Sequence, residues 1–219
     1  MPDLTFQVEG AEPQRFAVNP LLHFKLRLTQ TVTNGTPPTP IHAVALRCQI
    51  RIEPAKRRYE PVEQKHLVDL FGTPERWGKT LRPLLWTHVT AVVPPFTGNC
   101  LADLPVPCSY DFNVAATKYF AALKHDAIPL CFLFSGTVFY EAENGLQVTQ
   151  IPWEKEACFR LPAATWRGLM EMYYPNSVWL PLPKDAFDLL TQYKSRQGLP
   201  TIEQALERLL STAEEPVMP

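Results

Sequence analysis

Apolar and polar residues alternate along two long segments in the first quarter of the chain, residues 21–30 and 42–53. A period of two with one apolar face is typical of half-buried antiparallel strands. Because the two faces of a pleated strand point in opposite directions, one face of each segment should enter a core and the other should meet water. We therefore expect core positions at Phe24, Leu26, Leu46 and Ile50, and water-facing positions at Lys25, Arg47 and Arg51.

Weaker patterns fill most of the middle of the chain. The 23 prolines against 9 glycines indicate many short elements joined by stiff connections, because proline fixes φ and removes a hydrogen-bond donor. Residues 34–40 have the composition of a loop, and Ser135 with Gly136 is a candidate bulge. Further strands are predicted at 4–8, 86–93, 128–140, 146–151 and 157–161. Four other segments are not predicted as strands alone. Residues 62–71 have weak helical spacing, 75–78 resemble a turn, 100–107 look irregular, and 111–123 fit either a strand or a helix.

The last third of the chain changes to helical spacing, with helices expected over 163–174, 185–197 and 202–210. The fold class is then α+β: an antiparallel β-sheet or sandwich followed by two or three C-terminal helices. We expect a β-rich core domain over 1–161, a helical extension over 162–210 packed on it, and a disordered tail over 211–219. An immunoglobulin-like sandwich is the first architecture, and a sheet covered by a helical layer is the second.

Charge, apolar runs and cysteine content indicate the class of partner and the cellular location of the protein. The formal net charge is −1, which gives no basic excess for a nucleic acid or a membrane surface. The first ten residues lack a signal-peptide pattern, and no apolar run is long enough for a membrane span. Five cysteines without a signal peptide indicate reduced thiols, so a cytoplasmic location is expected.

Catalytic, cofactor-binding and metal-binding motifs are not recognisable in the sequence. The nearest cysteine pair, Cys100 and Cys108, lacks the close spacing of structural zinc or iron–sulfur sites. Cys48 and Cys131 fall on apolar faces of expected strands, where a free thiol behaves as a small hydrophobe. Neither a G-x-S-x-G elbow nor a glycine-rich phosphate loop occurs. An enzyme with an unlisted site stays open, because cysteine, histidine and carboxylate groups that are distant in the sequence can still meet in one pocket of the fold.

Aromatic residues mark the candidate interface. Tryptophan and tyrosine are enriched in interface hot spots because they bury much area with few torsions, although most tryptophans are core anchors. Trp77 and Trp179 are the two tryptophans expected to be exposed. The approach to the C-terminal helices gathers more aromatic residues, and a partner protein or a second copy of the chain is expected there, unless the chain's own sheet covers them: Trp166, Tyr173, Tyr174 and Trp179.

Three blocks of sequence carry a family resemblance: RCQIRIEP at 47–54 with 57–59, the stretch from 70–72 through 76–78 to LRPLLWTH at 81–88, and LFSGTVF at 133–139 with 152–153. They resemble an uncharacterised bacterial family, number 6084 among the domains of unknown function, over nearly the whole chain. That family has no assigned activity, so the resemblance supplies no site residues. The resemblance implies that the gene sits near those of uptake nickel–iron hydrogenases and their maturation factors. This association, which is not a mechanism, implies an accessory role.

A second resemblance, to the export chaperone SecB, covers residues 130–139 and 180–193, where strand, turn and closing helix follow in the same order. Three function classes follow from these observations. The first is a non-enzymatic accessory protein that binds another protein, such as a hydrogenase subunit or maturation factor. The second is a SecB-like holdase that keeps unfolded clients in apolar grooves, and the third is an enzyme with an unrecognised site.

The missing paired-ligand spacing predicts that the purified protein carries no stoichiometric metal. Elemental analysis should find well under one equivalent of zinc, iron or nickel per chain after treatment with a chelator. About one retained equivalent would contradict the prediction.

Overall fold

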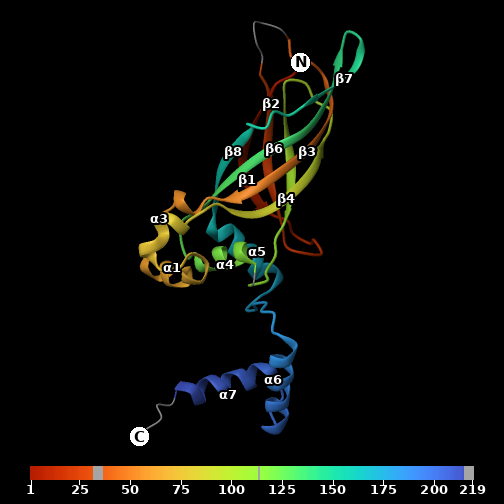
Figure 1. The fold of residues 1–219 in the computed structure, drawn as a ribbon. Helices are drawn as coiled ribbons and strands as arrows, with labels where there is room; N and C mark the ends of the chain where they lie inside the picture. The colour runs from red at the N-terminus through yellow and green to blue at the C-terminus, as the bar shows by residue number, and fades with distance from the viewer. Residues whose placement is uncertain (32–36, 113, 215–219) are drawn as a thin grey trace. The chain divides into compact units, whose positions relative to one another are not determined.

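The structure, a computed structural model, describes residues 1–31, 37–112 and 114–214. The chain divides into two compact units, Met1–Trp179 and Leu180–Pro219. In the first unit, two β-sheets form a sandwich with a group of helices at one end (Figure 1). None of the helices in these residue ranges is long and apolar enough to cross a membrane. Part of the predicted loop over 34–40 lies outside the described residues.

The described residues form eight strands: β1 (Leu4–Pro13), β2 (Leu21–Gln30), β3 (Ile41–Ile52), β4 (Leu84–Val93), β5 (Asn99–Pro107), β6 (Ala127–Ala142), β7 (Gly145–Gln150) and β8 (Glu156–Pro162). One sheet has the order β1-β2-β5. The other has the order β4-β3-β6-β7, and β8 pairs with the same β6. Every pairing between these strands is antiparallel. The α+β class is confirmed in its sandwich form, because each sheet buries its apolar face on the other sheet.

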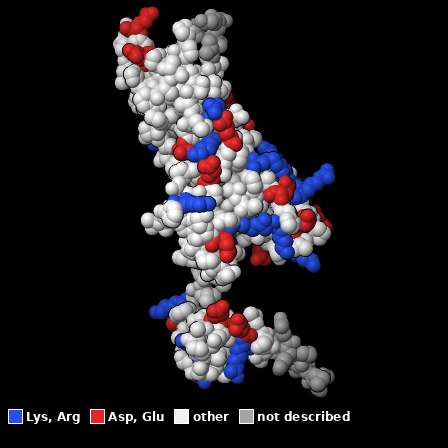
Figure 2. All heavy atoms as spheres, turned by 180° about the vertical axis from the view of Figure 1, so that it is seen from behind, with Lys and Arg blue, Asp and Glu red and all other residues white. Residues whose placement is uncertain are grey.

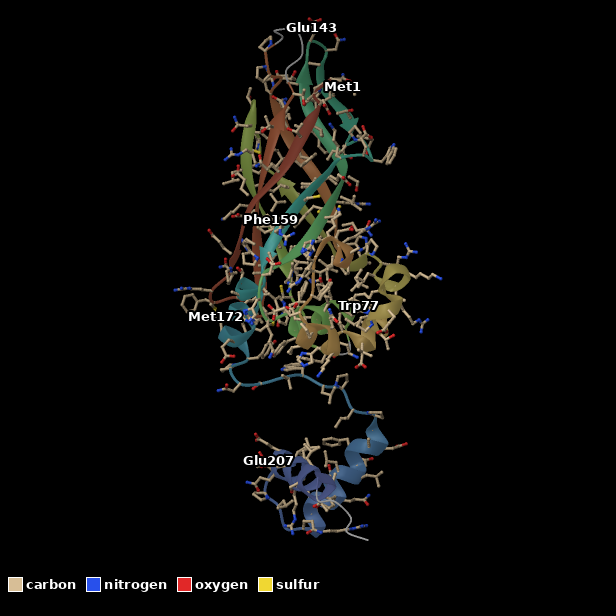
Figure 3. The ribbon with its side chains drawn as sticks, turned by 90° about the vertical axis from the view of Figure 1, so that its left-hand side faces the viewer. Met1, Trp77, Glu143, Phe159, Met172 and Glu207 are labelled. Atoms are coloured by element: carbon tan, nitrogen blue, oxygen red, sulfur yellow. The ribbon has the colours of Figure 1, made fainter. Side chains whose placement is uncertain are left out.

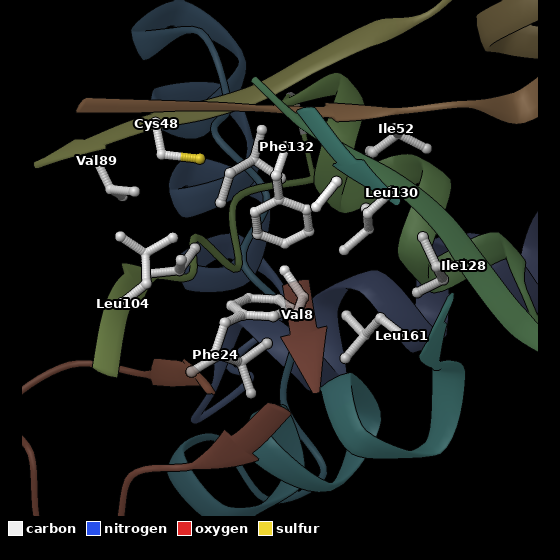
Figure 4. Close-up of a cluster of buried hydrophobic side chains, with 14 of the residues drawn as sticks. Val8, Phe24, Cys48, Ile52, Val89, Leu104, Ile128, Leu130, Phe132 and Leu161 are labelled. Carbon is white, nitrogen blue, oxygen red and sulfur yellow. The ribbon is translucent and has the colours of Figure 1, made fainter. Parts of the chain in front are cut away.

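The core lies between the two sheets, as the alternating segments predicted. Phe24, Leu26, Leu46 and Ile50 are each at most 2% exposed. Of the residues expected to face water, Arg47 is exposed and Lys25 and Arg51 are half-buried. Aromatic rings join the sheets: Phe24 of β2 meets Phe132 of β6 edge-on, with ring centroids 5.1 Å apart (Figure 4).

Strand β5 corrects the expectation that residues 100–107 are irregular. Pro105 and Pro107 make the segment read as a loop, but β5 pairs only with β2. The Cys108 N–H donates to the Pro20 carbonyl and the Gln30 N–H donates to the Gly98 carbonyl, which places the even-numbered residues in the hydrogen-bonded pairs. The backbone nitrogens of the odd-numbered prolines therefore face the free edge of the sheet. Proline is tolerated there, because no hydrogen bond to a neighbouring strand is lost.

Short helices and one longer helix cover one end of the sandwich: η1 (Pro54–Lys56), α1 (Pro61–His66), α2 (Val68–Phe71), η2 (Pro74–Arg76), α3 (Trp77–Thr80) and α4 (Ala115–Ala122). Trp77 lies in this group (Figure 3) and is only 9% exposed, which corrects the expectation that it faces water. Its indole N–H donates to the Gly72 carbonyl at 2.8 Å, and its ring packs edge-on against Tyr59 and Phe71. The segment predicted as a turn, 75–78, is therefore helical, and its tryptophan packs into the core.

A buried ion pair fixes these helices to β6. The Arg57 guanidinium donates to Glu63 Oε1 at 2.6 Å and to the His125 carbonyl at 2.9 Å. Burial by itself raises the pKa of Glu63, but the backbone N–H groups of Lys124 and Glu60 and the Arg57 charge outweigh that effect, so the pKa lies below its usual value. The carboxylate thus keeps its charge in a buried position because each oxygen has donors.

The helix α5 (Ala163–Tyr173) belongs to the first unit, because its buried residues Trp166, Leu169 and Met170 pack with β1, β8 and α4. The predicted domain boundary at 161/162 therefore falls inside that unit. The second unit contains α6 (Lys184–Arg196) and α7 (Ile202–Glu214). Residues 211–214, expected to be a disordered tail, are helical, and 215–219 lie outside the described residues. That α6 and α7 pack on the sheet stays a prediction.

Leu46→Ala should lower the free energy of unfolding by about 2–5 kcal/mol, because it deletes a buried side chain and leaves a cavity in the core. Val92 lies on β4 of the same sheet but is 77% exposed, so Val92→Ala is the matched control and should change stability little. Denaturant unfolding of both variants measures the difference. Equal losses would show that the register of the sheet is misplaced.

Glu63→Gln should destabilise the protein by roughly 3–5 kcal/mol at neutral pH, because it leaves Arg57 buried without its counter-charge. A carboxylate with a depressed pKa stabilises the fold above its unfolded pKa, and this stability disappears as the pH falls through the folded value. The wild type should therefore lose stability on acidification below about pH 4.5, and the gap to Glu63→Gln should narrow. A gap that is independent of pH would contradict the assignment.

Candidate functional site

The edge of β6 that faces β7 and β8 is interrupted at Ser135. The Ile151 N–H donates to the Gly136 carbonyl, and the Phe134 N–H donates to the Lys155 carbonyl. Three residues, 152–154, therefore lie opposite the single residue Ser135, where a regular strand would place one. The surplus residues form a bulge closed by a hydrogen bond from the Lys155 N–H to the Pro152 carbonyl at 3.2 Å. Trp153 and Glu154 lie at its tip.

The bulge is held from both sides. Lys155 Nζ lies 2.7 Å from Oδ1 of Asp3, the residue just before the strand β1 of the opposite sheet. Gly136 has a φ of +136°, and a Cβ added there would lie 2.1 Å from the Ala45 carbonyl oxygen of β3. Only glycine fits this close approach. The sequence predicted a bulge at Ser135 and Gly136; the extra residues belong to the opposing strand, and the β3–β6 register runs through Gly136 without a break.

Beside the bulge, the outer face of the five-stranded sheet carries an open hollow of about 790 Å³, which we call the sheet hollow. Strands β3, β4 and β6 form its floor, and the bulge with the start of β8 forms one wall. Because alternate residues share a face of a strand, the floor is assembled from every second position. The principal lining residues are Arg47, Gln49, Arg51, His88, Thr90, Leu133, Ser135, Trp153, Glu154 and Glu156.

The sheet hollow presents charges of both signs. Within the described ranges, the side chains of Arg47 and Glu154 form no ion pair and no hydrogen bond. Arg51 donates to the Gln49 side chain at 3.2 Å. Trp153 is 88% exposed at the rim. An open floor with an exposed indole, an unpaired guanidinium and an unpaired carboxylate suits an extended polypeptide or the surface of another protein.

The reverse side of the molecule differs in its charges. Figure 2 shows blue and red groups alternating over its middle, where the β1-β2-β5 sheet faces outward. There Lys25 Nζ lies 2.8 Å from Asp103 Oδ1, and the Arg27 guanidinium donates to both oxygens of Glu9. Those charges are satisfied within the sheet, so the unpaired charges of the sheet hollow distinguish the two faces.

The sheet hollow is lined by an imidazole and by hydroxyl groups, at His88, Ser135 and Thr90. His88 lies on its floor, but no hydroxyl or thiol is hydrogen-bonded to its ring within the described residues. Across those same residues, no group of three or more His, Cys, Asp and Glu side chains is placed to hold a metal ion. The Cys131 thiol donates a long hydrogen bond to Glu156 Oε2 at 3.8 Å.

The residues expected at an interface near α5 have separate environments. Trp166 is buried and packs against Phe120 and Tyr110. A partner therefore cannot reach its ring while the fold is intact. The Tyr173 hydroxyl donates to the Gln14 carbonyl at 2.9 Å and accepts from the Ala17 N–H at 2.9 Å, which fastens the β1–β2 connection to α5.

Tyr174 and Trp179 remain as the accessible pair near α5. Tyr174 stacks on Tyr110, with ring centroids 5.3 Å apart. Trp179 lies against Tyr174 at 5.3 Å and is 56% exposed.

Trp153 was not expected to be exposed, because a tryptophan between two short strands is usually a core anchor. The one sequence signal for its exposure was the preceding residue, Pro152. Proline has no N–H to donate to a neighbouring strand, so it indicates a break in the strand at this point.

Residues 1–218 match the sequence pattern of a family of unknown function, DUF6084. The chain belongs to this family. The match spans the sandwich, its helices and α7, so the sheet hollow lies within the DUF6084 region. No curated protein is significantly similar to the sequence. The resemblance to SecB is not confirmed by these comparisons.

Among solved structures, this DUF6084 chain is similar to the CARDB domain of a protein from Pyrococcus furiosus, crystallised in complex with di-metal ions. The sequence identity is 14%, the match covers 74% of this chain and 87% of that one, and the TM-score is 0.27. A TM-score of this size supports no conclusion about fold or function.

Trp166→Ala should cost about 3–5 kcal/mol of stability, because it removes a large buried ring that contacts other aromatic residues. Trp179→Ala should cost much less, because that ring is more than half exposed. Thermal unfolding of the two variants separates a core role from a surface role. A similar, large loss in Trp179→Ala would show that Trp179 is a structural residue rather than part of a docking surface.

Proposed function

We propose that this DUF6084 protein is a non-enzymatic accessory protein that binds another protein through the sheet hollow. The observation that carries the proposal is the combination, in one open hollow, of unpaired Arg47, unpaired Glu154 and exposed Trp153. Charges of both signs and an exposed indole therefore line the same hollow. Such a group supplies one aromatic anchor and two charges that fix the orientation of a partner.

The shape of the sheet hollow favours a macromolecular partner over a small molecule. Small-molecule sites enclose most of the ligand surface in a concave cavity. The sheet hollow is open to solvent, and charged side chains from its strands stand beside apolar surface. An open floor of this kind beside a projecting aromatic residue matches the aromatic anchor and charged rim of a protein interface.

The class of partner follows from the resemblance rather than from the geometry. We propose that the partner is a subunit or a maturation factor of a nickel–iron hydrogenase, since the family resemblance implies that association. The five free cysteines fit a reducing cytoplasm, where both proteins would meet.

A holdase function is the second candidate, and a separate observation favours it. Large apolar side chains are exposed on the β1–β2 connection, at Phe16 and Val18, and on α7, at Leu206, Leu209 and Leu210. Exposed apolar patches mark interaction sites, and a holdase would use such groups to hold the apolar segments of unfolded clients. This function would use these residues and not the charges of the sheet hollow.

Affinity purification from the native host, followed by identification of the co-purified proteins, tests the proposal. Trp153→Ala and Arg47→Glu should each reduce recovery of a specific partner about tenfold, as expected for loss of a hot-spot contact worth about 1.4 kcal/mol or more. Arg58→Glu is the matched control for Arg47→Glu, because it reverses the same charge on an exposed side chain outside the sheet hollow. All variants should unfold at nearly the same temperature as the wild type.

Unchanged recovery in both hollow variants would overturn the proposal. If Leu206→Asp and Leu210→Asp abolish binding of many unfolded clients while the hollow variants do not, the holdase function takes its place.

A further inference from the structure

We propose that Cys131 and Cys158 form a reversible disulfide across β6 and β8, closed by exchange with a low-molecular-weight disulfide such as glutathione disulfide. The proposal concerns a modification site and does not depend on the function proposed for the sheet hollow. It starts from the register, in which Cys131 and Cys158 are direct partners on neighbouring antiparallel strands.

The hydrogen-bond pattern identifies the kind of pair. The Phe134 N–H donates to the Lys155 carbonyl, and the Ala163 N–H donates to the Asp126 carbonyl. Even-numbered residues of β6 are therefore in hydrogen-bonded pairs with β8, and odd-numbered residues are in non-hydrogen-bonded pairs. Pro129, which has no N–H to give, occupies an odd position in agreement with this pattern. Cys131 and Cys158 are thus a non-hydrogen-bonded pair.

Distances in such a pair suit a disulfide. Non-hydrogen-bonded partners have Cα atoms about 4.5 Å apart and bring their side chains closer together than hydrogen-bonded partners. Disulfides span Cα distances of about 4.4–6.8 Å, so a pair of this kind lies at the short end of the range. Both side chains leave the same face of the sheet, because direct partners always do. Bond formation therefore needs side-chain rotation rather than backbone movement.

The other cysteines lack this arrangement. Cys48 points into the core from β3 and pairs with Phe134, and Cys100 pairs with Leu28 in the other sheet. Cys108 is buried after the end of β5. In every strand pairing of the described residues, Cys131 and Cys158 alone place one cysteine opposite another.

The two thiols have different access to a reagent. Cys158 is exposed, whereas Cys131 is buried. Burial, with the nearby Glu156 carboxylate, raises the pKa of Cys131 to about 11, so this thiol is almost entirely protonated at neutral pH. The exposed Cys158 therefore reacts first, and Cys131 completes the exchange.

The exchange balances in two steps. The Cys158 thiolate attacks glutathione disulfide, forms an S–S bond with one glutathione and releases the other as a thiolate. The Cys131 sulfur then attacks Cys158 Sγ, the mixed disulfide breaks, and the second glutathione leaves with the proton from Cys131. Two protein thiols are oxidised to one disulfide, and one glutathione disulfide is reduced to two glutathione molecules. Excess reduced glutathione reverses both steps.

The test treats the folded full-length protein with glutathione disulfide, blocks the remaining thiols and digests it with trypsin. Trypsin cuts after Lys124, Lys155 and Arg160, so the two cysteines fall on separate peptides, 125–155 and 156–160. We expect these peptides to be joined by a disulfide that reduced glutathione opens. Closure should speed up as the pH rises toward the pKa of Cys131, and in Glu156→Gln, which removes a charge that opposes the Cys131 thiolate.

Three variants check the assignment. Cys131→Ala should keep glutathione on Cys158 as a mixed disulfide, Cys158→Ser should leave Cys131 unmodified, and the control Cys100→Ser should form the cross-link as the wild type does. A wild-type protein that keeps the mixed disulfide at alkaline pH, links different cysteines, or forms the link only after unfolding would overturn the proposal. Failure of Cys158 to react at all would overturn it as well.

Discussion

One edge of β6 is shared by two strands, and the surplus residues at their junction shape this side of the molecule. Ile151 and Lys155 bond to β6 on either side of Ser135, so the chain between them must leave the sheet. Its exit lifts Trp153 and Glu154 above the sheet and creates the wall of the sheet hollow. The same junction sets the register of β8, which in turn brings Cys158 opposite Cys131. Gly136 permits this arrangement because the Ala45 carbonyl occupies the space of a side chain.

A row of aromatic contacts connects the sandwich to its helices. Phe24 of the smaller sheet meets Trp86 of β4, Trp86 meets Phe120 of α4 at 4.9 Å, and Phe120 meets Trp166 of α5 at 5.4 Å. Contacts of this kind add a directional preference to the burial of apolar area. The helical end of the unit is therefore an extension of the core, and Arg57 with Glu63 adds a polar anchor whose donors and acceptors are all within the fold.

Much of the fold could be predicted because its longest strands have one buried face. The segments that became β2 and β3 show uninterrupted alternation, and Leu46 and Ile50 are in the core as expected. β5 was missed because proline is read as a strand breaker, and only the register shows that Pro105 faces a free edge. Trp77 was misjudged because its partners, Tyr59 and Phe71, meet it only after the chain folds into several short helices.

The site itself was beyond prediction from sequence. Arg47 and Trp153 come from distant parts of the chain, and their proximity depends on the pairing of β3 with β6 and on the bulge that follows β7. Likewise, Cys131 and Cys158 have no motif spacing, and only the β6–β8 register makes them neighbours. A sequence motif detects functional residues by their spacing along the chain, whereas these residues become neighbours only through the pairing of strands.

The bulge also has a consequence for how the protein behaves in a crowded solution. A long, uninterrupted edge strand offers a ladder of free N–H and C=O groups to which another chain can add. Here the outer edge formed by β7 and β8 is broken between Gln150 and Glu156, and Pro152 removes one donor from the gap. A foreign strand would find two short, offset ladders with a tryptophan and a carboxylate projecting between them. The irregularity that forms the sheet hollow thus also blunts edge-to-edge aggregation.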